Sequence, residues 1–85
     1  MTANPTLWPF SGERLKLTRE IQGLSQDELA AMLGITRSLL VQFEIDLLAP
    51  KGELLDRLSF AVGFPLDFFY MGPLDDFPLG SLLLH

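Results

Sequence analysis

The sequence contains no cysteine, and its only histidine is the last residue, His85. Without cysteine there is no disulfide framework and no thiolate metal site. A lone histidine has no second ligand at metal-binding spacing, so we expect no metal and no cofactor. No nucleophile, base and orienting group occur at a recognisable spacing either, which argues against an enzyme.

Long apolar runs are also missing. Apolar residues make up 48% of the 85 residues, but they occur in groups far shorter than the ~20 residues that a membrane-spanning helix needs. The first ten residues, MTANPTLWPF, contain no basic segment followed by an apolar stretch, so nothing marks the chain for export. We therefore expect one small cytoplasmic domain with no membrane partner.

Positive charge is scarce. Lysine and arginine number 6 against 11 acidic residues, which gives a net charge of −5. Residues 11–50 hold four bases and six acids, and residues 51–85 hold two bases and five acids. Because phosphate affinity comes mainly from lysine and arginine, this balance argues against a non-specific nucleic-acid binder.

No stretch alternates apolar and polar residues as a paired strand would, so the fold is expected to be all-α. Ser25 and Glu28 have the S-x-x-E spacing of a capping box, and Gly34 can close the helix that this box begins. The same analysis of caps, glycines and prolines predicts helices over residues 12–22, 25–33, 37–45, 53–62 and 66–70. An irregular arm over residues 1–11 precedes them, and an extended tail over residues 71–85 follows.

The aromatic residues near the two ends of this helical region have two interpretations. They could stack on single-stranded nucleic acid, or they could pack in the core. No basic residues lie between them, so core packing is favoured. The residues concerned are Trp8, Phe64, Phe68, Phe69 and Tyr70.

The segment GLSQDELAAMLGITRSLLVQFE, residues 23–44, has the spacing of two helices joined by a tight turn. Together with RLKLTREIQ before it and LLDRLSFAVGFPLDFFY after it, this segment resembles the Cro/CI-type, or XRE-type, helix-turn-helix family over residues 12–70. The resemblance implies a five-helix, lambda-repressor-like domain of a transcriptional regulator. It also implies that the third helix enters the major groove of double-stranded DNA, with the chain acting as half of a homodimer.

The resemblance also assigns roles to single residues. Gln26 matches the family's glutamine that holds a phosphate and braces the third helix. Arginine can grip guanine and glutamine can pair with adenine, although polar residues on an outer helix face can also be merely solvated. The candidate DNA-binding residues are Gln26, Thr36, Arg37, Ser38, Leu39, Val41 and Gln42. Arg19 and Glu44 match a structural ion pair of lambdoid repressors.

Three residues depart from the family pattern. Leu39 and Val41 stand where relatives usually carry polar residues, although either could contact a thymine methyl group. Asp46 stands where a glycine is expected, and a carboxylate there would face phosphates. A second hypothesis is therefore an interaction or dimerisation module that does not bind DNA tightly. Its apolar surface would consist of Leu39, Val41, Ile45, Leu47 and Leu48.

A narrower resemblance concerns the segments EIDLLAPKGELLDRLSFAVGFPLDFFY and FPLGSLLLH. They are similar to the N-terminal domain of regulators that continue into an ImmA/IrrE-type zinc metallopeptidase domain. This similarity implies a peptidase domain beyond His85 in a longer chain. The HExxH helix of such a peptidase does not occur in these 85 residues, so none of its chemistry is assigned here.

Overall fold

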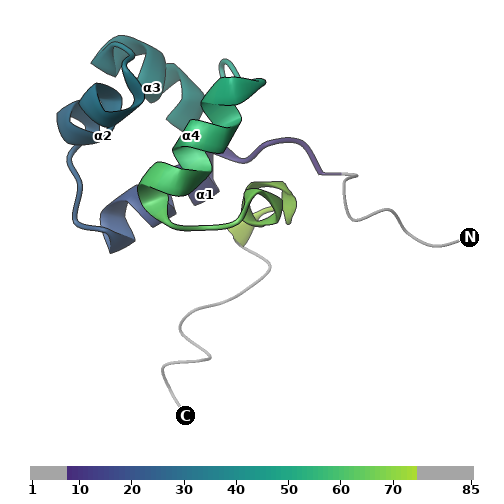
Figure 1. Cartoon of the computed structure of the whole chain (residues 1–85). Helices are drawn as coiled ribbons and strands as arrows, with labels where there is room; N and C mark the ends of the chain where they lie inside the picture. Colours follow the sequence, from purple (N-terminus) through teal and green to yellow (C-terminus); the bar gives the residue numbers. More distant parts are fainter. Residues whose placement is uncertain (1–7, 75–85) are drawn as a thin grey trace, which may run out of the picture.

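The computed structural model describes residues 8–74, and this region is entirely helical, with no strand among the described residues. Figure 1 shows the arrangement, in which α4 crosses in front of α1 while α2 and α3 lie side by side above it. The elements are α1 (Gly12–Ile21), α2 (Gln26–Leu33), α3 (Arg37–Glu44), α4 (Glu53–Val62) and the 3-10 helix η2 (Leu66–Tyr70). The predicted all-α fold with five helices is confirmed, and its fifth helix is a single 3-10 segment. Residues 1–7 of the predicted arm and 75–85 of the predicted tail lie outside the described residues.

Helices α2 and α3 begin at side-chain caps that the sequence had indicated. The Ser25 hydroxyl accepts a hydrogen bond from the Glu28 backbone N–H at 3.0 Å, and the Glu28 carboxylate accepts one from the Ser25 N–H at 2.8 Å. The Thr36 hydroxyl accepts from the Leu39 N–H at 3.1 Å. These contacts satisfy donors that a helix start leaves without a partner inside the helix, and so they fix where α2 and α3 begin.

The core lies between the helices and is closed by the 3-10 helix. Leu15, Leu29 and Leu40, from the first three helices, are completely buried. Phe69 is also completely buried, and its ring stacks on that of Phe10 at 5.4 Å between centroids. Phe64, Phe68 and Tyr70 pack against this core, which confirms the packing interpretation for the aromatic residues of η2 and the segment before it. For Trp8 the interpretation is wrong, because its side chain is 48% exposed. None of the helices within residues 8–74 is long and apolar enough to cross a membrane.

Asp46 joins the end of α3 to the start of α1. Its backbone has a φ of +64°, in the left-handed region, where the family's glycine would be unstrained. Its carboxylate accepts a hydrogen bond from the Gly12 N–H at 2.7 Å. A Cβ on Gly12 would lie 2.2 Å from the Phe43 carbonyl oxygen, so glycine is required at this contact. The carboxylate is thus directed at the positive start of α1, whereas the sequence had suggested that it would face phosphates.

The contact predicts how substitutions of Asp46 will behave. Replacing Asp46 with alanine should lower the free energy of unfolding by about 1–2 kcal/mol, because it removes the cap and leaves a residue that tolerates a positive φ poorly. Asp46→Gly should cost less, because glycine adopts this φ without strain. Urea denaturation of both variants measures the difference. Equal stability of wild type and Asp46→Ala would contradict the capping role.

Candidate nucleic-acid interface

The turn between α2 and α3 sets the two helices at an angle and leaves the start of α3 exposed. Gly34 has a φ of +71° and its N–H bonds to carbonyls of the last turn of α2, so α2 ends there. Thr36 then caps α3. Leu33 and Leu40, on either side of the turn, are buried in the core, whereas Arg37 is exposed to solvent. Figure 1 shows the two helices adjacent, with α3 at the upper edge of the domain.

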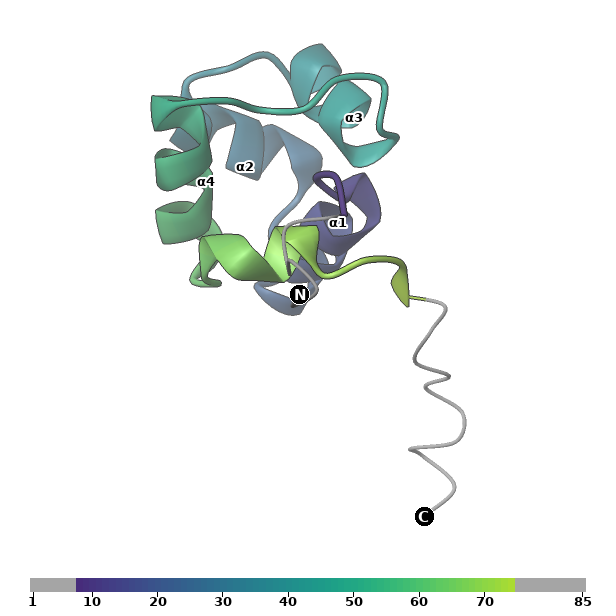
Figure 2. The same cartoon turned by 90° about the vertical axis from the view of Figure 1, so that its right-hand side faces the viewer.

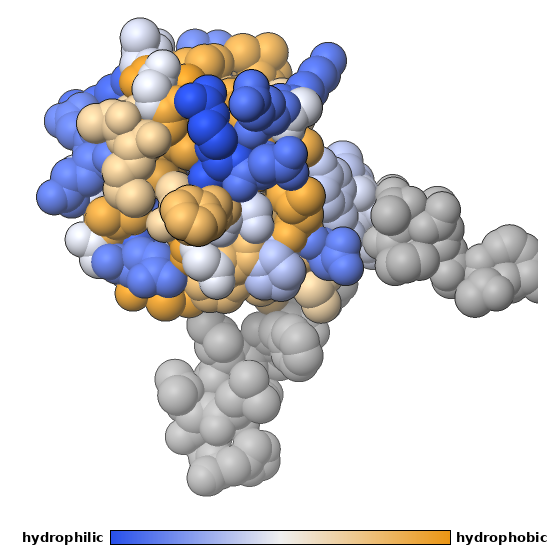
Figure 3. Space-filling model, viewed as in Figure 1, coloured by the Kyte–Doolittle hydropathy of each residue, from blue (hydrophilic) through white to orange (hydrophobic). Residues whose placement is uncertain are grey.

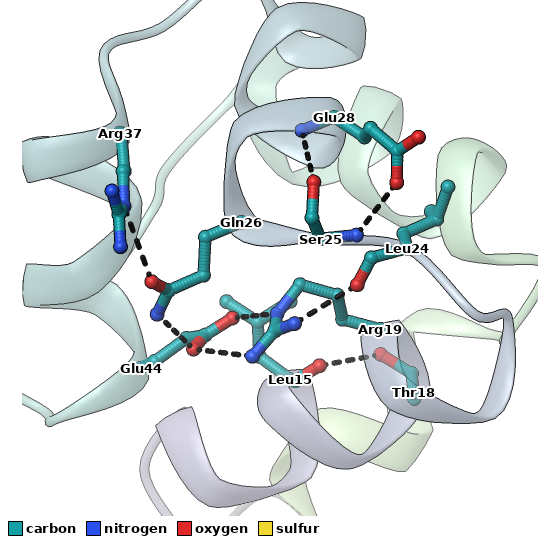
Figure 4. A network of polar contacts seen from close by, with 9 residues as sticks. All are labelled: Leu15, Thr18, Arg19, Leu24, Ser25, Gln26, Glu28, Arg37 and Glu44. Carbon is teal, nitrogen blue, oxygen red and sulfur yellow. Dashed lines mark hydrogen bonds and ion pairs between the residues drawn. The ribbon is translucent and has the colours of Figure 1, made fainter.

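A chain of hydrogen bonds connects this exposed start to the interior, as Figure 4 shows. The Arg37 Nε donates to the Gln26 Oε1 at 3.4 Å, and the Gln26 Nε2 donates to the Glu44 Oε1 at 3.0 Å. The Glu44 carboxylate also accepts from the Nε and Nη2 of Arg19, at 2.6 and 3.2 Å. The Arg19 Nη1 donates to the Leu24 carbonyl at 2.9 Å. The network therefore ties both ends of α3 to α1 and α2.

The two ends of this network differ in burial. The side chains of Arg19 and Glu44 are 10% and 3% exposed, whereas that of Arg37 is 62% exposed. A buried, bidentate pair resists disruption because loss of either partner leaves a charge without compensation. Arg37 also lies 4.0 Å from the Asp27 carboxylate, but this exposed contact contributes little. The buried pair of Arg19 and Glu44 thus supports the accessible side chain of Arg37.

The network leaves most of the Arg37 guanidinium available. Its hydrogen bond to Gln26 uses Nε, and among the described residues neither terminal nitrogen donates a hydrogen bond. The planar fork formed by those nitrogens is the group that recognises guanine or a phosphate. Gln26 is half-buried and has both ends of its amide engaged. Its amide orientation is consequently fixed by its neighbours.

The other predicted contact residues differ in accessibility. Thr36 and Ser38 are exposed beside Arg37. Gln42 is half-buried and donates to the Ser38 carbonyl at 3.3 Å, so a contact with a base would require this bond to be exchanged. Leu39 and Val41 are also half-buried, and Leu39 packs against the core. The structure therefore groups Thr36, Arg37 and Ser38 most closely at the surface.

Two of the bases counted along residues 11–50 are internal. Besides Arg19, Arg14 is buried, donates from Nε to the Gly72 carbonyl at 2.6 Å and lies 4.7 Å from the centre of the Phe68 ring. Sequence reasoning missed this role. Arg14 precedes the fully buried Thr18 by four residues, and residues four apart share a helix face. This spacing was the signal that could have predicted the burial of Arg14.

An apolar surface lies just beyond the end of α3. Leu47 and Leu48 are 66% and 48% exposed, and Ile45 is 59% exposed. Leu47 and Leu48 line an open groove of about 620 Å³, together with Trp8, Phe10 and Gly72. The apolar set predicted from the sequence is therefore divided. Leu39 packs against the core and Val41 is half-buried, whereas Ile45, Leu47 and Leu48 are accessible to a partner.

Comparison with known proteins identifies the arrangement. The sequence profile of the family described as "Helix-turn-helix domain" matches residues 12–73. The SPbeta prophage-derived uncharacterized HTH-type transcriptional regulator YonR of Bacillus subtilis (strain 168) is 39% identical over 72 residues, which span 85% of this chain and 67% of that protein.

Two solved structures have the same fold and are bound to DNA. The P22 c2 repressor in complex with a synthetic operator is 29% identical, with a TM-score of 0.69, over 76% of this chain and 98% of that chain. The biofilm regulator SinR in complex with DNA is 30% identical, with a TM-score of 0.60, over 65% of this chain and 89% of that chain.

Proposed function

Because this chain belongs to the helix-turn-helix domain family, with the Cro/CI-type fold, we propose that it is the DNA-binding domain of a transcriptional regulator. The observation that carries the proposal is the exposed guanidinium of Arg37 at the start of α3, braced by Gln26 and anchored to a buried ion pair. The structural relatives were determined on DNA, which supports the same role here.

In the proposed complex α3 lies in the major groove. Arg37 reaches a guanine edge with its terminal nitrogens, and Thr36 and Ser38 contact the adjacent base or phosphate. The backbone N–H groups at the starts of α2 and α3 point toward the phosphates, where the positive end of each helix favours an anion. Gln26 can contribute one further donor, since its Nε2 carries two hydrogens and one is given to Glu44. This footprint needs few basic residues, in agreement with the net charge of −5.

We propose that the chain binds DNA as a homodimer. A single domain with so few phosphate contacts would bind weakly, and a second half-site supplies the remaining affinity. Ile45, Leu47 and Leu48, exposed just after α3, offer an apolar surface for a second copy close to the DNA. A dimer of this kind binds two half-sites about one helical turn apart.

Selection from a pool of random duplexes tests the proposal. The expected product is a pair of inverted half-sites that contain a guanine and have centres about one turn, ~10 base pairs, apart. Enrichment of a single half-site would contradict the proposed homodimer and would still support the proposed DNA-binding domain. Failure to enrich any sequence, with a protein shown to be folded by circular dichroism, would contradict the proposed function.

The small phosphate footprint predicts a weak dependence of DNA affinity on salt. Each neutralised phosphate contributes about −0.9 to the slope of log K against log salt concentration. With Arg37 as the base at the start of α3, and Arg14 and Arg19 engaged internally, the slope on a selected duplex should be shallow. Fluorescence anisotropy over a salt series measures it. A loss of several orders of magnitude between low and physiological salt would contradict this footprint.

The second candidate function is an interaction module that has lost DNA binding. The accessible Ile45, Leu47 and Leu48 and the groove beside them favour it. The two functions separate on substitution. Loss of duplex binding in Arg37→Ala with intact folding supports the DNA-binding domain. Loss of protein binding or self-association only in Leu47→Ser and Leu48→Ser supports the interaction module.

Three finer expectations stay proposals. None of the relatives reported above is described as a peptidase, so a continuation into an ImmA/IrrE-type peptidase domain rests on sequence resemblance alone. The family and its regulator relatives favour binding over catalysis. A DNA-binding regulator acts where the chromosome lies, and we therefore keep the cytoplasm as the proposed location.

A further inference from the structure

The outer face of α4 carries one residue that breaks its pattern. Glu53, Asp56, Arg57 and Phe60 follow the i, i+3, i+4, i+7 spacing of a single helix face. Three of them are charged, as expected for a solvated face. Phe60 is 88% exposed, more than any other large apolar side chain of the described residues. A side chain so exposed contributes little to folding, because it removes little apolar surface from water.

Phe60 does not stand alone on the surface. Met32, near the end of α2, is 53% exposed, and together with Ala61 the two side chains form the apolar part of an open groove between α2 and α4. The groove has a volume of about 740 Å³. Figure 3 views the side of the molecule that carries α4, and it shows orange apolar surface interrupted by blue charged residues. We call this groove the α2–α4 face, lined by Met32, Glu53, Asp56, Arg57, Phe60 and Ala61.

Two of the three charged side chains that line this face, Glu53 and Asp56, are negative, and Arg57 is positive. The Arg57 Nη1 lies 4.0 Å from the position that a Cβ on Gly34 would occupy, so its guanidinium extends toward the end of α2. The positive guanidinium there faces the partial negative charge that a helix C-terminus carries. The carboxylates of Glu53 and Asp56 are exposed on the same groove. The α2–α4 face therefore combines an apolar floor with an acidic rim.

We propose that the α2–α4 face docks a basic amphipathic segment of another protein, with apolar side chains against Phe60 and Met32 and lysine or arginine against Glu53 and Asp56. An acidic rim disfavours nucleic acid and anionic lipid. It also disfavours a second copy of the chain, because in a two-fold interface the one guanidinium, Arg57, can pair with only one of the two carboxylates that face it. Charge complementarity thus selects a cationic protein partner.

The position of this face makes the interaction compatible with DNA binding. In Figure 2, α4 and α3 lie toward opposite sides of the domain, and Figure 1 places α4 in front of α3. A segment on the outer face of α4 would leave the exposed start of α3 accessible. The inference goes beyond the proposed function and does not depend on it, because a domain that bound no DNA would still present this face.

The test uses a fluorescent synthetic helix of ~14 residues built from leucine and lysine, long enough to be helical when bound. Anisotropy titrations with the whole chain should show binding. Phe60→Ser should weaken it about tenfold or more, as expected for a central apolar anchor. Met71→Ser is the matched control: its side chain is 59% exposed, does not line this groove, and should leave the affinity unchanged. Thermal unfolding verifies that both variants are folded.

Three results would overturn the proposal. The first is equal affinity of Phe60→Ser and Met71→Ser for the leucine–lysine helix, which would reduce the binding to non-specific charge attraction. The second is equal binding of a helix in which glutamate replaces every lysine, since this would remove the role of Glu53 and Asp56. The third is self-association of the chain that Phe60→Ser abolishes, which would assign the face to a second copy.

Discussion

Replacing Glu44 with alanine is expected to lower the free energy of unfolding by about 3–5 kcal/mol, the range for removing one partner of a buried ion pair. The glutamate side chain is 3% exposed and accepts three hydrogen bonds, two from Arg19 and one from Gln26. Its loss would leave the Arg19 guanidinium in the interior with one carbonyl partner, Leu24. Each kcal/mol corresponds to roughly 4–8 °C in melting temperature for a domain of this size, so calorimetry or circular dichroism will detect the change readily.

Two control variants distinguish the effect of losing the charge of Glu44 from the effect of losing its volume. Glu44→Gln preserves the volume and can still accept from Gln26, so it should cost less than alanine. The double variant Arg19→Met with Glu44→Leu removes both charges, and such apolar replacements of buried pairs are often neutral or stabilising. It should therefore recover most of the lost stability. A cost below about 1 kcal/mol for Glu44→Ala, the value typical of surface pairs, would contradict the structural role of this pair.

The sequence was most informative where structure depends on neighbours along the chain. The boundaries of α2 follow from the Ser25 and Glu28 capping box and from Gly34, all within ten residues. The predicted ends of α1 and α3, at residues 22 and 45, differ from the observed ends by one residue each. Caps and left-handed glycines act locally, so their residue types alone locate a helix.

Contacts between distant residues could not be predicted in the same way. Arg14 bonds to the carbonyl of a residue 58 positions away, and Asp46 accepts from Gly12 across 34 positions. From sequence, Arg14 is one of the four bases counted along residues 11–50, and Asp46 is an acid that would face phosphates. The fold engages both internally. The exposure of Phe60, by contrast, could be read from the sequence, because Phe60 shares its helix face with the charged Glu53, Asp56 and Arg57.

Replacing Arg37 with alanine is expected to weaken binding to a selected duplex by about 1–3 kcal/mol per half-site, or roughly 5–150-fold. If the chain binds as a dimer, the two half-sites add, which makes this the largest expected loss of function from a single substitution. Stability should change little, because the side chain is 62% exposed and its contact with Gln26 is long, at 3.4 Å. Arg37→Lys should retain part of the affinity and lose the preference for guanine, because lysine has the charge without the planar fork.

The most direct test of the central claim compares discrimination between base pairs. Wild type, Arg37→Ala and Arg57→Ala are titrated against a selected duplex and against the same duplex with the recognised G·C pair changed to A·T. Arg57→Ala removes an equal charge from α4, a helix that carries none of the proposed DNA contacts. We expect wild type and Arg57→Ala to prefer the selected duplex and Arg37→Ala to bind both equally. Undiminished preference in Arg37→Ala would show that the exposed start of α3 does not read the sequence of the DNA.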